Sequence, residues 1–418
     1  MTNPQNPPVP EGVALGAGVV RRNAVLADGR ELIYYDDPGT SLPPERRMDE
    51  RELTPRPETA TMRRDVLTGD WISVAAARQS RVVMPPADLD PLAPQSPTNP
   101  SELPSLYDVA VFENRSPSFG PALDEAVGAA PVAVDPPRGL DDLDAPGLGR
   151  SRTSVGRCEV VCFSPERTGS FGTQSVTRAR TVIEAWADRT AALSALPGVR
   201  QVFVFENRGA EIGVTLQHPH GQIYAYPYVT PRTTSLLASI EREGPDLFER
   251  IIAFEQDGPR VLLEGEHWIA YVPFAARWPI EVHLAPRRHA PDFAALTAQE
   301  RDELAPLYLR LLRGIDALYG DESHAAFAGG TPYIAAWHQT PVAVGRDTAR
   351  LHLQLTSPRR GADKLKYLAG SEAAMGAWIG DIPPEQAADR LREAIARVAD
   401  PASGDTTAGG SIEGSQPR

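Results

Sequence analysis

Near the middle of the chain, two histidines stand two residues apart in the sequence His218-Pro219-His220-Gly221-Gln222-Ile223-Tyr224-Ala225-Tyr226-Pro227. Alternate residues of an extended backbone point to one face, so we predict a strand that presents His218, His220 and Gln222 in a row. A neutral imidazole is a good nucleophile near pH 7, and an amide can donate a hydrogen bond to a phosphoryl oxygen. The row suits nucleotidyl transfer through a phosphohistidine. On these residues alone, a solvent-facing polar strand or a hydrogen-bonded core histidine stands as the alternative.

The bulk properties of the chain limit its class. Its 418 residues allow about two or three domains, and a hydrophobic content of 41% supports real cores. The formal net charge is −13, and the sequence contains no run of Lys or Arg. It therefore lacks the electrostatic footprint of a protein that binds nucleic acid or an anionic membrane. A phosphate ester would have to be held by a few local arginines.

Both cysteines lie in one predicted strand, four residues apart. An extended chain places Cys158 and Cys162 about 13 Å apart, which is too far for a disulfide. The sequence also shows no secretory leader and no apolar run of membrane-spanning length. We therefore expect a cytoplasmic protein.

Changes in composition and periodicity divide the chain into four segments. Residues 1–60 form a partly disordered arm with a hairpin over 19–35, and the Gly/Ser/Thr-rich tail 401–418 is expected to be disordered. Two domains, 61–232 and 233–400, lie between them. Apolar periodicity predicts helices over 176–193 and 233–256, a helix within 292–318 and a closing helix near 384–398. Residues 117–150 form a surface excursion.

The two domains share one order of elements. The first has a strand ending at Ser164-Pro165, a helix, the strand 201–205 and the row of His218, His220 and Gln222. The second has the strand 280–285, a helix, the strand 333–337 and a reduced row, His352-x-Gln354. Duplication of one unit explains the length. We predict an α+β fold of two similar halves, with antiparallel sheets, helices packed on them and one working copy of the site.

These motifs resemble, in their order, the galactose-1-phosphate uridylyltransferase family of the histidine-triad superfamily, over about residues 62–398. The matching stretches are 68–72, 205–209, 218–222, 266–268, 273–279 and 337–338. Gln222 is the most specific feature, because histidine-triad hydrolases have a third histidine at that position. The resemblance implies a duplicated histidine-triad-like domain.

The resemblance also implies a nucleotidyltransferase of galactose metabolism that works by double displacement. His220 would attack the α-phosphorus of UDP-glucose and release glucose 1-phosphate, and galactose 1-phosphate would then take the uridylyl group. Gln222 would bind a non-bridging phosphoryl oxygen and, unlike a histidine, would not activate water. A nucleotide phosphorylase, an adenylyl or guanylyl transferase of the superfamily, and a non-catalytic nucleotide-sugar binder remain open as alternatives.

Further site residues follow from the same resemblance. Arg78 and Arg81 alone could be an exposed surface pair, but they match arginines that hold phosphates. The positions implied to contact the nucleotide and its phosphates are Arg78, Arg81, Asn114, Asn207 and Thr215. The C-terminal segment of the family touches the sugar and reaches the partner subunit of a homodimer; its matching residues are Lys366, Tyr367 and Glu372. Trp378 stands where a sugar-binding glutamine is expected, which leaves the choice of sugar open.

No metal cofactor is expected. The zinc positions of the family read here Asp90, Ala93, Arg167 and His218. One imidazole does not make a structural zinc site, so we expect His218 to hydrogen-bond near Arg167 or Asp90. The positions of a second, iron-type site read Leu236, His338, His352 and Gln354, and whether the two histidines bind metal stays open. The other histidines are taken as structural or surface residues: His267, His283, His289 and His324.

Overall fold

The computed structural model describes residues 11–56, 59–80, 85–120, 147–323 and 330–401. Four predictions concern residues outside these ranges: the phosphate contact of Arg81, the role of His324, most of the excursion 117–150, and the disorder expected at the two ends of the chain.

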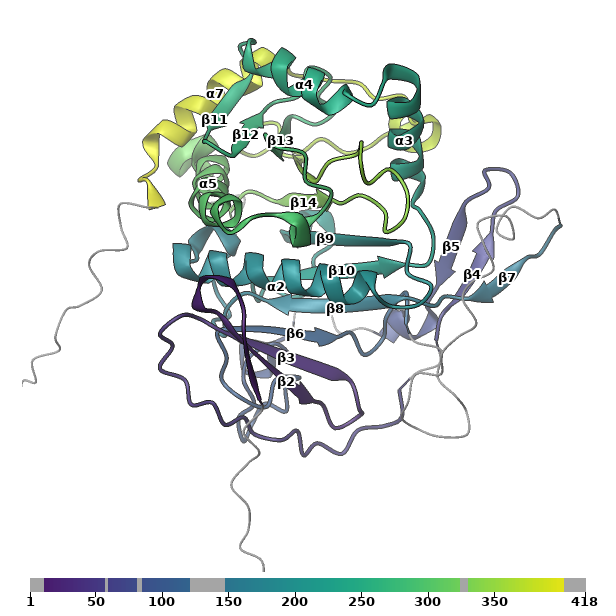
Figure 1. Cartoon of the computed structure of the whole chain (residues 1–418), viewed down its shortest axis with the longest axis vertical. Helices are drawn as coiled ribbons and strands as arrows, with labels where there is room; N and C mark the ends of the chain where they lie inside the picture. Colours follow the sequence, from purple (N-terminus) through teal and green to yellow (C-terminus); the bar gives the residue numbers. More distant parts are fainter. Residues whose placement is uncertain (1–10, 57–58, 81–84, 121–146, 324–329, 402–418) are drawn as a thin grey trace, which may run out of the picture.

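Twelve strands of the described residues form one sheet, in which every neighbouring pair is antiparallel (Figure 1). The predicted hairpin over 19–35 provides its second and third strands. In spatial order the strands are β1 (Gly12–Ala14), β2 (Val20–Val25), β3 (Glu31–Asp36), β6 (Val109–Glu113), β8 (Arg157–Cys162), β10 (His220–Tyr226), β9 (Gln201–Arg208), β14 (Tyr333–His338), β15 (His352–Ser357), β13 (Ile280–Pro286), β12 (Trp268–Tyr271) and β11 (Val261–Glu264).

A second, three-stranded sheet stands out from the body of the molecule (Figure 1). Its strands are β5 (Trp71–Val74), β4 (Thr61–Arg64) and β7 (Ser151–Thr153), with β4 in the middle. The first two are the predicted strand–turn–strand unit, and Gly69 has the positive φ of 81° that its turn requires. This sheet leads directly into the segment that carries Arg78.

Two long helices, α2 (Val176–Ser194) and α5 (Ala298–Asp316), lie side by side on one face of the large sheet, and α7 (Pro384–Arg397) packs on α5 (Figure 1). Each long helix starts at a side-chain cap, since Ser175 accepts from the amide of Arg178, and Thr297 from that of Glu300. Trp186 of α2 packs on Trp337 of β14, with ring centroids 6.1 Å apart. One apolar core therefore joins the two halves.

The strand order shows the duplication directly. The first half contributes β8-β10-β9 and the second β13-β15-β14, and the halves meet where β9 pairs with β14. Strand β15 begins at His352, as β10 begins at His220. The predicted α+β architecture of two similar halves is confirmed.

The single helix predicted over 233–256 is wrong, because the chain forms two helices, α3 (Pro231–Glu243) and α4 (Leu247–Gln256). Gly244 has φ +112°, and Pro245 follows it. A positive φ interrupts the helix, and proline has no amide to continue it. The short helix α6 (Gly370–Met375) was not predicted.

The described residues also form short 3-10 helices: η1 (Gly16–Gly18), η2 (Ala76–Ser80), η3 (Ala87–Leu89), η4 (Phe171–Thr173), η5 (Ala210–Ile212), η6 (Phe293–Ala295) and η7 (Ala317–Ser323).

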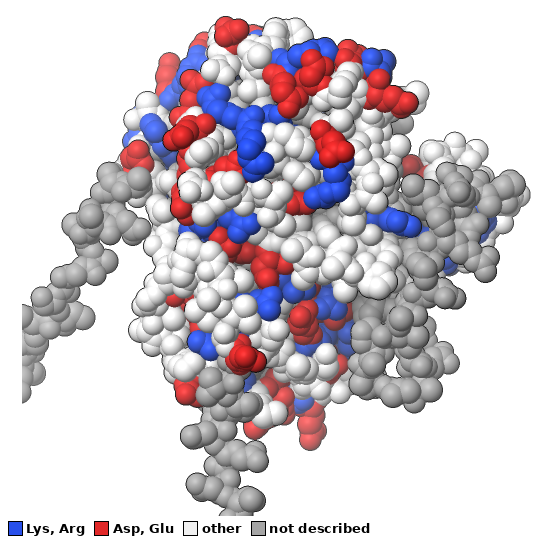
Figure 2. Space-filling model, viewed as in Figure 1, with Lys and Arg blue, Asp and Glu red and all other residues white. Residues whose placement is uncertain are grey.

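Basic and acidic side chains intermix on the face drawn in Figure 2, where no large patch of one sign covers the described residues.

None of the helices in the described ranges has the length and apolar composition needed to span a membrane.

Candidate active site

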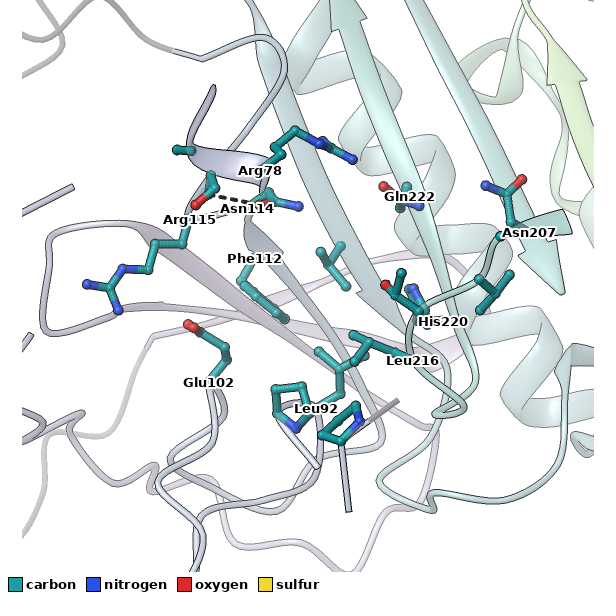
Figure 3. Close-up of a pocket in the computed structure, with 18 of the residues that line it drawn as sticks. Arg78, Leu92, Glu102, Phe112, Asn114, Arg115, Asn207, Leu216, His220 and Gln222 are labelled. Atoms are coloured by element: carbon teal, nitrogen blue, oxygen red, sulfur yellow. Dashed lines mark hydrogen bonds between the residues drawn. The ribbon is translucent and has the colours of Figure 1, made fainter. Parts of the chain in front are cut away.

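A pocket of about 790 Å³ lies at the first half of the large sheet. Side chains from β6, β8, β9 and β10 line one part of it. The loops over residues 85–102, 114–116 and 213–216 line the rest, together with Arg30, Ala77 and Arg78. Six of the predicted site residues border this pocket: Arg78, Asn114, Asn207, Thr215, His220 and Gln222. In Figure 3, Asn207, Gln222 and His220 lie at one end and Glu102 and Arg115 at the other, with Phe112 between them.

Strand β10 places His220 and Gln222 on the pocket face. Along the strand, buried residues alternate with half-buried ones, and Gly221 and Ile223 point into the core. A Cβ atom on Gly221 would lie 2.9 Å from the ring of Phe163 and 3.1 Å from the carbonyl oxygen of Phe205. The close approach of these neighbours leaves room only for glycine, which explains the residue between the two polar side chains.

The prediction that His218 shares a row with His220 and Gln222 is wrong. Strand β10 begins at His220, and His218 lies before it with a side chain that is buried outside the pocket. Pro219 stands between them, and its missing amide and fixed φ end the regular strand pattern at that point. The simple alternation of an extended chain therefore does not reach back to His218.

His218 is held on both edges of its ring. Its Nδ1 lies 2.8 Å from Oδ2 of Asp90, and its Nε2 lies 2.7 Å from the carbonyl oxygen of Ser164. The hydroxyl of Tyr107 is 3.1 Å from the same Nε2. The expectation of a hydrogen bond near Asp90 is confirmed. Burial opposes ionisation of Asp90, but the hydrogen bond from His218 and the charges nearby outweigh it and lower the pKa of the carboxyl group.

The ring of His220 is oriented by the backbone of His218. Its Nδ1 lies 2.7 Å from the carbonyl oxygen of His218. Because a carbonyl can only accept, Nδ1 carries the proton, and Nε2 of the neutral ring carries the lone pair. Beside it, the hydroxyl of Tyr224 donates to Oε1 of Gln222 at 3.3 Å, so the amide nitrogen is the group of Gln222 that can donate to a ligand.

Two further polar groups of the pocket, Arg78 and Asn114, are anchored to its walls. Arg78 donates from Nη1 to the hydroxyl of Ser118 at 2.9 Å. The side-chain oxygen of Asn114 accepts from the amide of Ser116 at 3.0 Å, which fixes the turn after β6. A guanidinium and amides around an imidazole form a set of donors suited to phosphate and nucleotide groups.

Sequence reasoning missed the apolar middle of the pocket and its far end. Phe112, Leu92 and Leu216 lie between the two ends (Figure 3). Phe112 precedes Asn114 by two residues, so strand alternation was a usable signal for it. Glu102 and Arg115 come from loops, and no local pattern places them in the pocket.

The three C-terminal residues lie together but away from the pocket that holds His220. Lys366 and Tyr367 border a separate pocket of about 170 Å³ with Trp278. The ammonium group of Lys366 lies 2.8 Å from Oε1 of Glu372, and this hydrogen bond lowers the pKa of the carboxyl group. Tyr367 points outward and is 74% exposed. Within one chain, the structure therefore does not bring these residues to His220.

The family's zinc positions do not fit zinc here. The two residues with usable donor atoms, Asp90 and His218, bond each other, and both ring nitrogens of His218 face oxygen acceptors. Ala93 offers no side-chain donor, and Arg167 is a cation whose Nη2 lies 3.3 Å from the carbonyl oxygen of Pro85. A tetrahedral site cannot be assembled from this set.

The second set of family metal positions does not fit either. His338 and His352 stack with ring centroids 5.0 Å apart, and Leu236 offers no donor. Nδ1 of His352 bonds the carbonyl oxygen of Arg350 at 2.8 Å, and its Nε2 lies 3.3 Å from the amide of Gln354. Among the residues that the structure describes, no three His, Cys, Asp or Glu side chains are grouped to hold a metal ion.

The fold and the site together define a class, a duplicated histidine-triad protein with a nucleotide-sized pocket around His220 and Gln222. Two family models match the chain: galactose-1-phosphate uridyl transferase, N-terminal domain, over residues 58–230, and C-terminal domain, over residues 241–402. The chain belongs to the galactose-1-phosphate uridyl transferase family.

Named relatives agree with this assignment. The galactose-1-phosphate uridylyltransferase of Streptomyces lividans is 44% identical, over 88% of this chain and 96% of that protein. The enzyme of the same name from Thermotoga maritima is 32% identical, over 79% of this chain and 98% of that protein. A solved uridylyltransferase structure superposes with a TM-score of 0.67 at 28% identity, covering 81% of this chain and 99% of that one.

Proposed function

We propose that the protein transfers the uridylyl group of UDP-glucose to galactose 1-phosphate, giving UDP-galactose and glucose 1-phosphate. The observation that carries the proposal is the pair on β10, in which His220 and Gln222 face one pocket and the Nδ1 proton of His220 is fixed by a carbonyl. Family membership supplies the substrate class.

In the first half-reaction, Nε2 of His220 attacks the α-phosphorus of UDP-glucose. The bond from that phosphorus to the bridging oxygen breaks, and glucose 1-phosphate leaves with the electron pair. The ring of the uridylyl-histidine gains a positive charge, which the hydrogen bond from Nδ1 to the carbonyl of His218 stabilises. In the second half-reaction, a phosphate oxygen of galactose 1-phosphate attacks the same phosphorus, and His220 leaves as a neutral ring.

Gln222 and Arg78 stabilise the charge that develops on the phosphoryl oxygens. The Gln222 amide donates without being able to transfer a proton, so it positions the phosphoryl group and gives no help to an attacking water. Arg78, and Arg81 outside the described residues, neutralise the diphosphate. Asn114, Asn207 and Thr215 provide polar contacts for the nucleotide within a pocket of about 790 Å³.

We further propose a homodimer in which the C-terminal segment completes the sugar site of the partner subunit. Two observations support this. Lys366 and Glu372 fix each other away from the pocket of their own chain, and large apolar side chains of the same segment stay exposed, among them Tyr367 at 74% and Met375 at 79%. Exposed apolar groups of this size in one segment are typical of an interface. Light scattering after size-exclusion chromatography should give twice the mass of one chain, and a monomer would contradict the shared site.

The mechanism that we propose uses no metal. We also propose that the protein works in the cytoplasm, where the buried free thiols of Cys158 and Cys162 stay reduced. Burial raises the pKa of Cys158 to about 12, so this thiol is not a nucleophile at neutral pH.

An isotope-exchange experiment tests the double displacement. Labelled glucose 1-phosphate is incubated with UDP-glucose and the protein, without galactose 1-phosphate. A covalent intermediate predicts that the label appears in UDP-glucose, because the first half-reaction is reversible. Absence of exchange in a preparation that converts both substrates would contradict the intermediate. Release of a nucleoside diphosphate that requires inorganic phosphate would instead identify a phosphorylase.

A further inference from the structure

We propose that Asp90 is a positioning residue for His220, which it holds through the ring and backbone of His218. The proposal rests on the proposed function only in naming His220 as the nucleophile. Asp90 does not itself line the pocket, although its neighbours Leu89 and Pro91 do, and its side chain bonds His218 and the amide of Leu92 in its own loop.

Two short hydrogen bonds connect the carboxylate to the nucleophile. Oδ2 of Asp90 lies 2.8 Å from Nδ1 of His218, and the carbonyl oxygen of His218 lies 2.7 Å from Nδ1 of His220. Asp90 and His218 are both buried, with 4% and 2% exposure. The carbonyl that sets the tautomer of His220 therefore belongs to a residue whose side chain is fixed by Asp90.

Asp90 is itself fixed by its loop. Its Oδ1 accepts from the amide of Leu92 at 3.0 Å, and its carbonyl oxygen accepts from the side chain of Asn99 at 2.8 Å. On the other edge of the His218 ring, the Ser164 carbonyl and the Tyr107 hydroxyl complete the clamp, and that hydroxyl lies 2.7 Å from the Leu92 carbonyl. Three separate segments thus hold one imidazole.

The position of the His218 carbonyl depends on this clamp. Pro219 follows His218 and has no amide to donate, so the backbone tie of the turn lies after His218, where the Pro219 carbonyl accepts from the amide of Phe163 at 3.2 Å. The His218 carbonyl itself is positioned by the clamp on its own side chain. Removing Asp90 would leave Nδ1 of His218 buried without its acceptor, and the ring would have to move to find another. A shift of about 1 Å at a reacting group can cost on the order of 100-fold in rate.

The second half of the molecule provides an independent observation. Arg350 stands two residues before His352, as His218 stands two residues before His220. Its guanidinium bonds the carbonyls of Pro286 and Arg287 at the end of β13, as His218 bonds the carbonyl of Ser164 after β8. A carboxylate, Glu249, pairs with it. Both halves therefore anchor this turn by the same arrangement: a carboxylate, a cationic or donor side chain, and the carbonyls at the end of the adjacent strand.

In the first half, this arrangement uses Asp90 and His218, two of the positions that match the family's zinc ligands. Both nitrogens of the His218 ring already face oxygen acceptors, so the turn is held by protein groups alone.

The test compares Asp90→Ala with Asp88→Ala, which removes an exposed carboxylate of the same loop. The single-turnover rate of uridylyl transfer to the protein and the Kd of UDP-glucose are measured separately. We expect Asp90→Ala to lower the rate on the order of 100-fold with an unchanged Kd, and Asp88→Ala to change neither. An unchanged rate, or a rate and a Kd that worsen together, would overturn the proposal.

Asp90→Asn covers the case in which Asp90→Ala does not fold. The introduced amide would keep an oxygen acceptor for Nδ1 of His218 but not the charge. An intermediate rate at unchanged Kd is therefore expected, and a wild-type rate would overturn the proposal.

In a His220→Gly background rescued by free imidazole, the effect of Asp90→Ala on the rate should shrink, because free imidazole is not held by the His218 carbonyl. An effect of full size there would overturn the proposal, since Asp90 would then support the whole pocket. Failure of the wild type to become labelled would instead count against the proposed function.

Discussion

His220 and His352 begin equivalent strands of the two halves and make the same hydrogen bond, from Nδ1 to the backbone carbonyl two residues earlier, at 2.7 Å and 2.8 Å. Their surroundings differ. His220 borders the large pocket, whereas His352 is 6% exposed and packs against the ring of Phe248 at 5.3 Å between centroids. The two imidazoles are therefore oriented in the same way, but of the two only His220 borders the large pocket that a substrate could enter.

Gln222 and Gln354 occupy equivalent positions in the two halves, so their alanine variants can be compared directly. Gln222→Ala removes the donor that we assign to the phosphoryl oxygen, and the rate of uridylyl transfer should fall on the order of 10²–10³-fold. Gln354→Ala removes the equivalent amide beside His352 and should leave the rate near that of the wild type. Single-turnover labelling of both variants provides the measurement. Equal losses in the two variants would mean that Gln222 has no special role.

Gly221 is expected to be intolerant of a side chain. Gly221→Ala places a methyl group 2.9 Å from the buried ring of Phe163 and 3.1 Å from the Phe205 carbonyl, so the unfolding free energy should fall by about 1–3 kcal/mol. Gly370→Ala is the control, because a Cβ there meets no atom within 4 Å. Denaturant unfolding measures both, and a Gly221→Ala protein of unchanged stability would contradict the packing described here.

Acid should destabilise the protein through its buried histidines. Burial and the nearby charges of His283 and Arg232 lower the pKa of His352 to about 3, and burial lowers the pKa of His338 well below its ordinary value. Below about pH 6.5, the unfolded chain binds protons at these positions that the folded protein does not. The unfolding free energy therefore falls as the pH drops from 6.5, by up to about 1.4 kcal/mol per pH unit for each group.

Glu206 has the opposite effect on the unfolding free energy as the pH falls. Burial raises its pKa to about 7, so the folded protein binds a proton between pH 7 and about 4.5 that the unfolded chain does not, and acid stabilises it there. The comparison of wild type with His352→Gln separates the two effects, because Glu206 is common to both. Unfolding at pH 7.5 and pH 5 should show a smaller loss in the variant, and equal losses would contradict a neutral His352.

The purified protein should contain far less than one zinc per chain, and prolonged treatment with a chelator should leave its transfer rate unchanged. The physical reason is that His218 already bonds Asp90 and the Ser164 carbonyl. Elemental analysis on protein from zinc-supplemented medium is the measurement. If the protein contained one zinc per chain and lost both the zinc and its activity on chelation, the conclusion that these positions do not bind zinc would be wrong.

Local patterns in the sequence predicted the parts of the fold that depend on neighbours in the chain. The alternation around His220 placed Gln222 on the same face, and apolar periodicity located α2 and α5. Periodicity could not show the break at Gly244, because the apolar positions of α3 and α4 stay compatible with one helix. There, backbone conformation overrode the pattern.

Strand alternation predicted the shared face of His220 and Gln222, and only the family resemblance supplied the residues off the strands that also border the pocket, Arg78, Asn114 and Thr215. His218 left the predicted row because Pro219 ends the strand pattern, and its contacts to Tyr107 and Ser164 join residues more than fifty positions apart. Glu102 reaches the far end of the pocket in the same way. Such contacts depend on tertiary packing, which leaves no periodic signal in the sequence.

The covalent uridylyl-histidine can be located directly on the protein. The protein is incubated with UDP-glucose labelled in the uridylyl group, quenched and digested, and the labelled peptide is sequenced by mass spectrometry. We predict one uridylyl group per active chain on His220, no label in His220→Ala and normal labelling in His352→Ala. Label at another residue, undiminished label in His220→Ala, or no label on an actively turning-over wild type would contradict it.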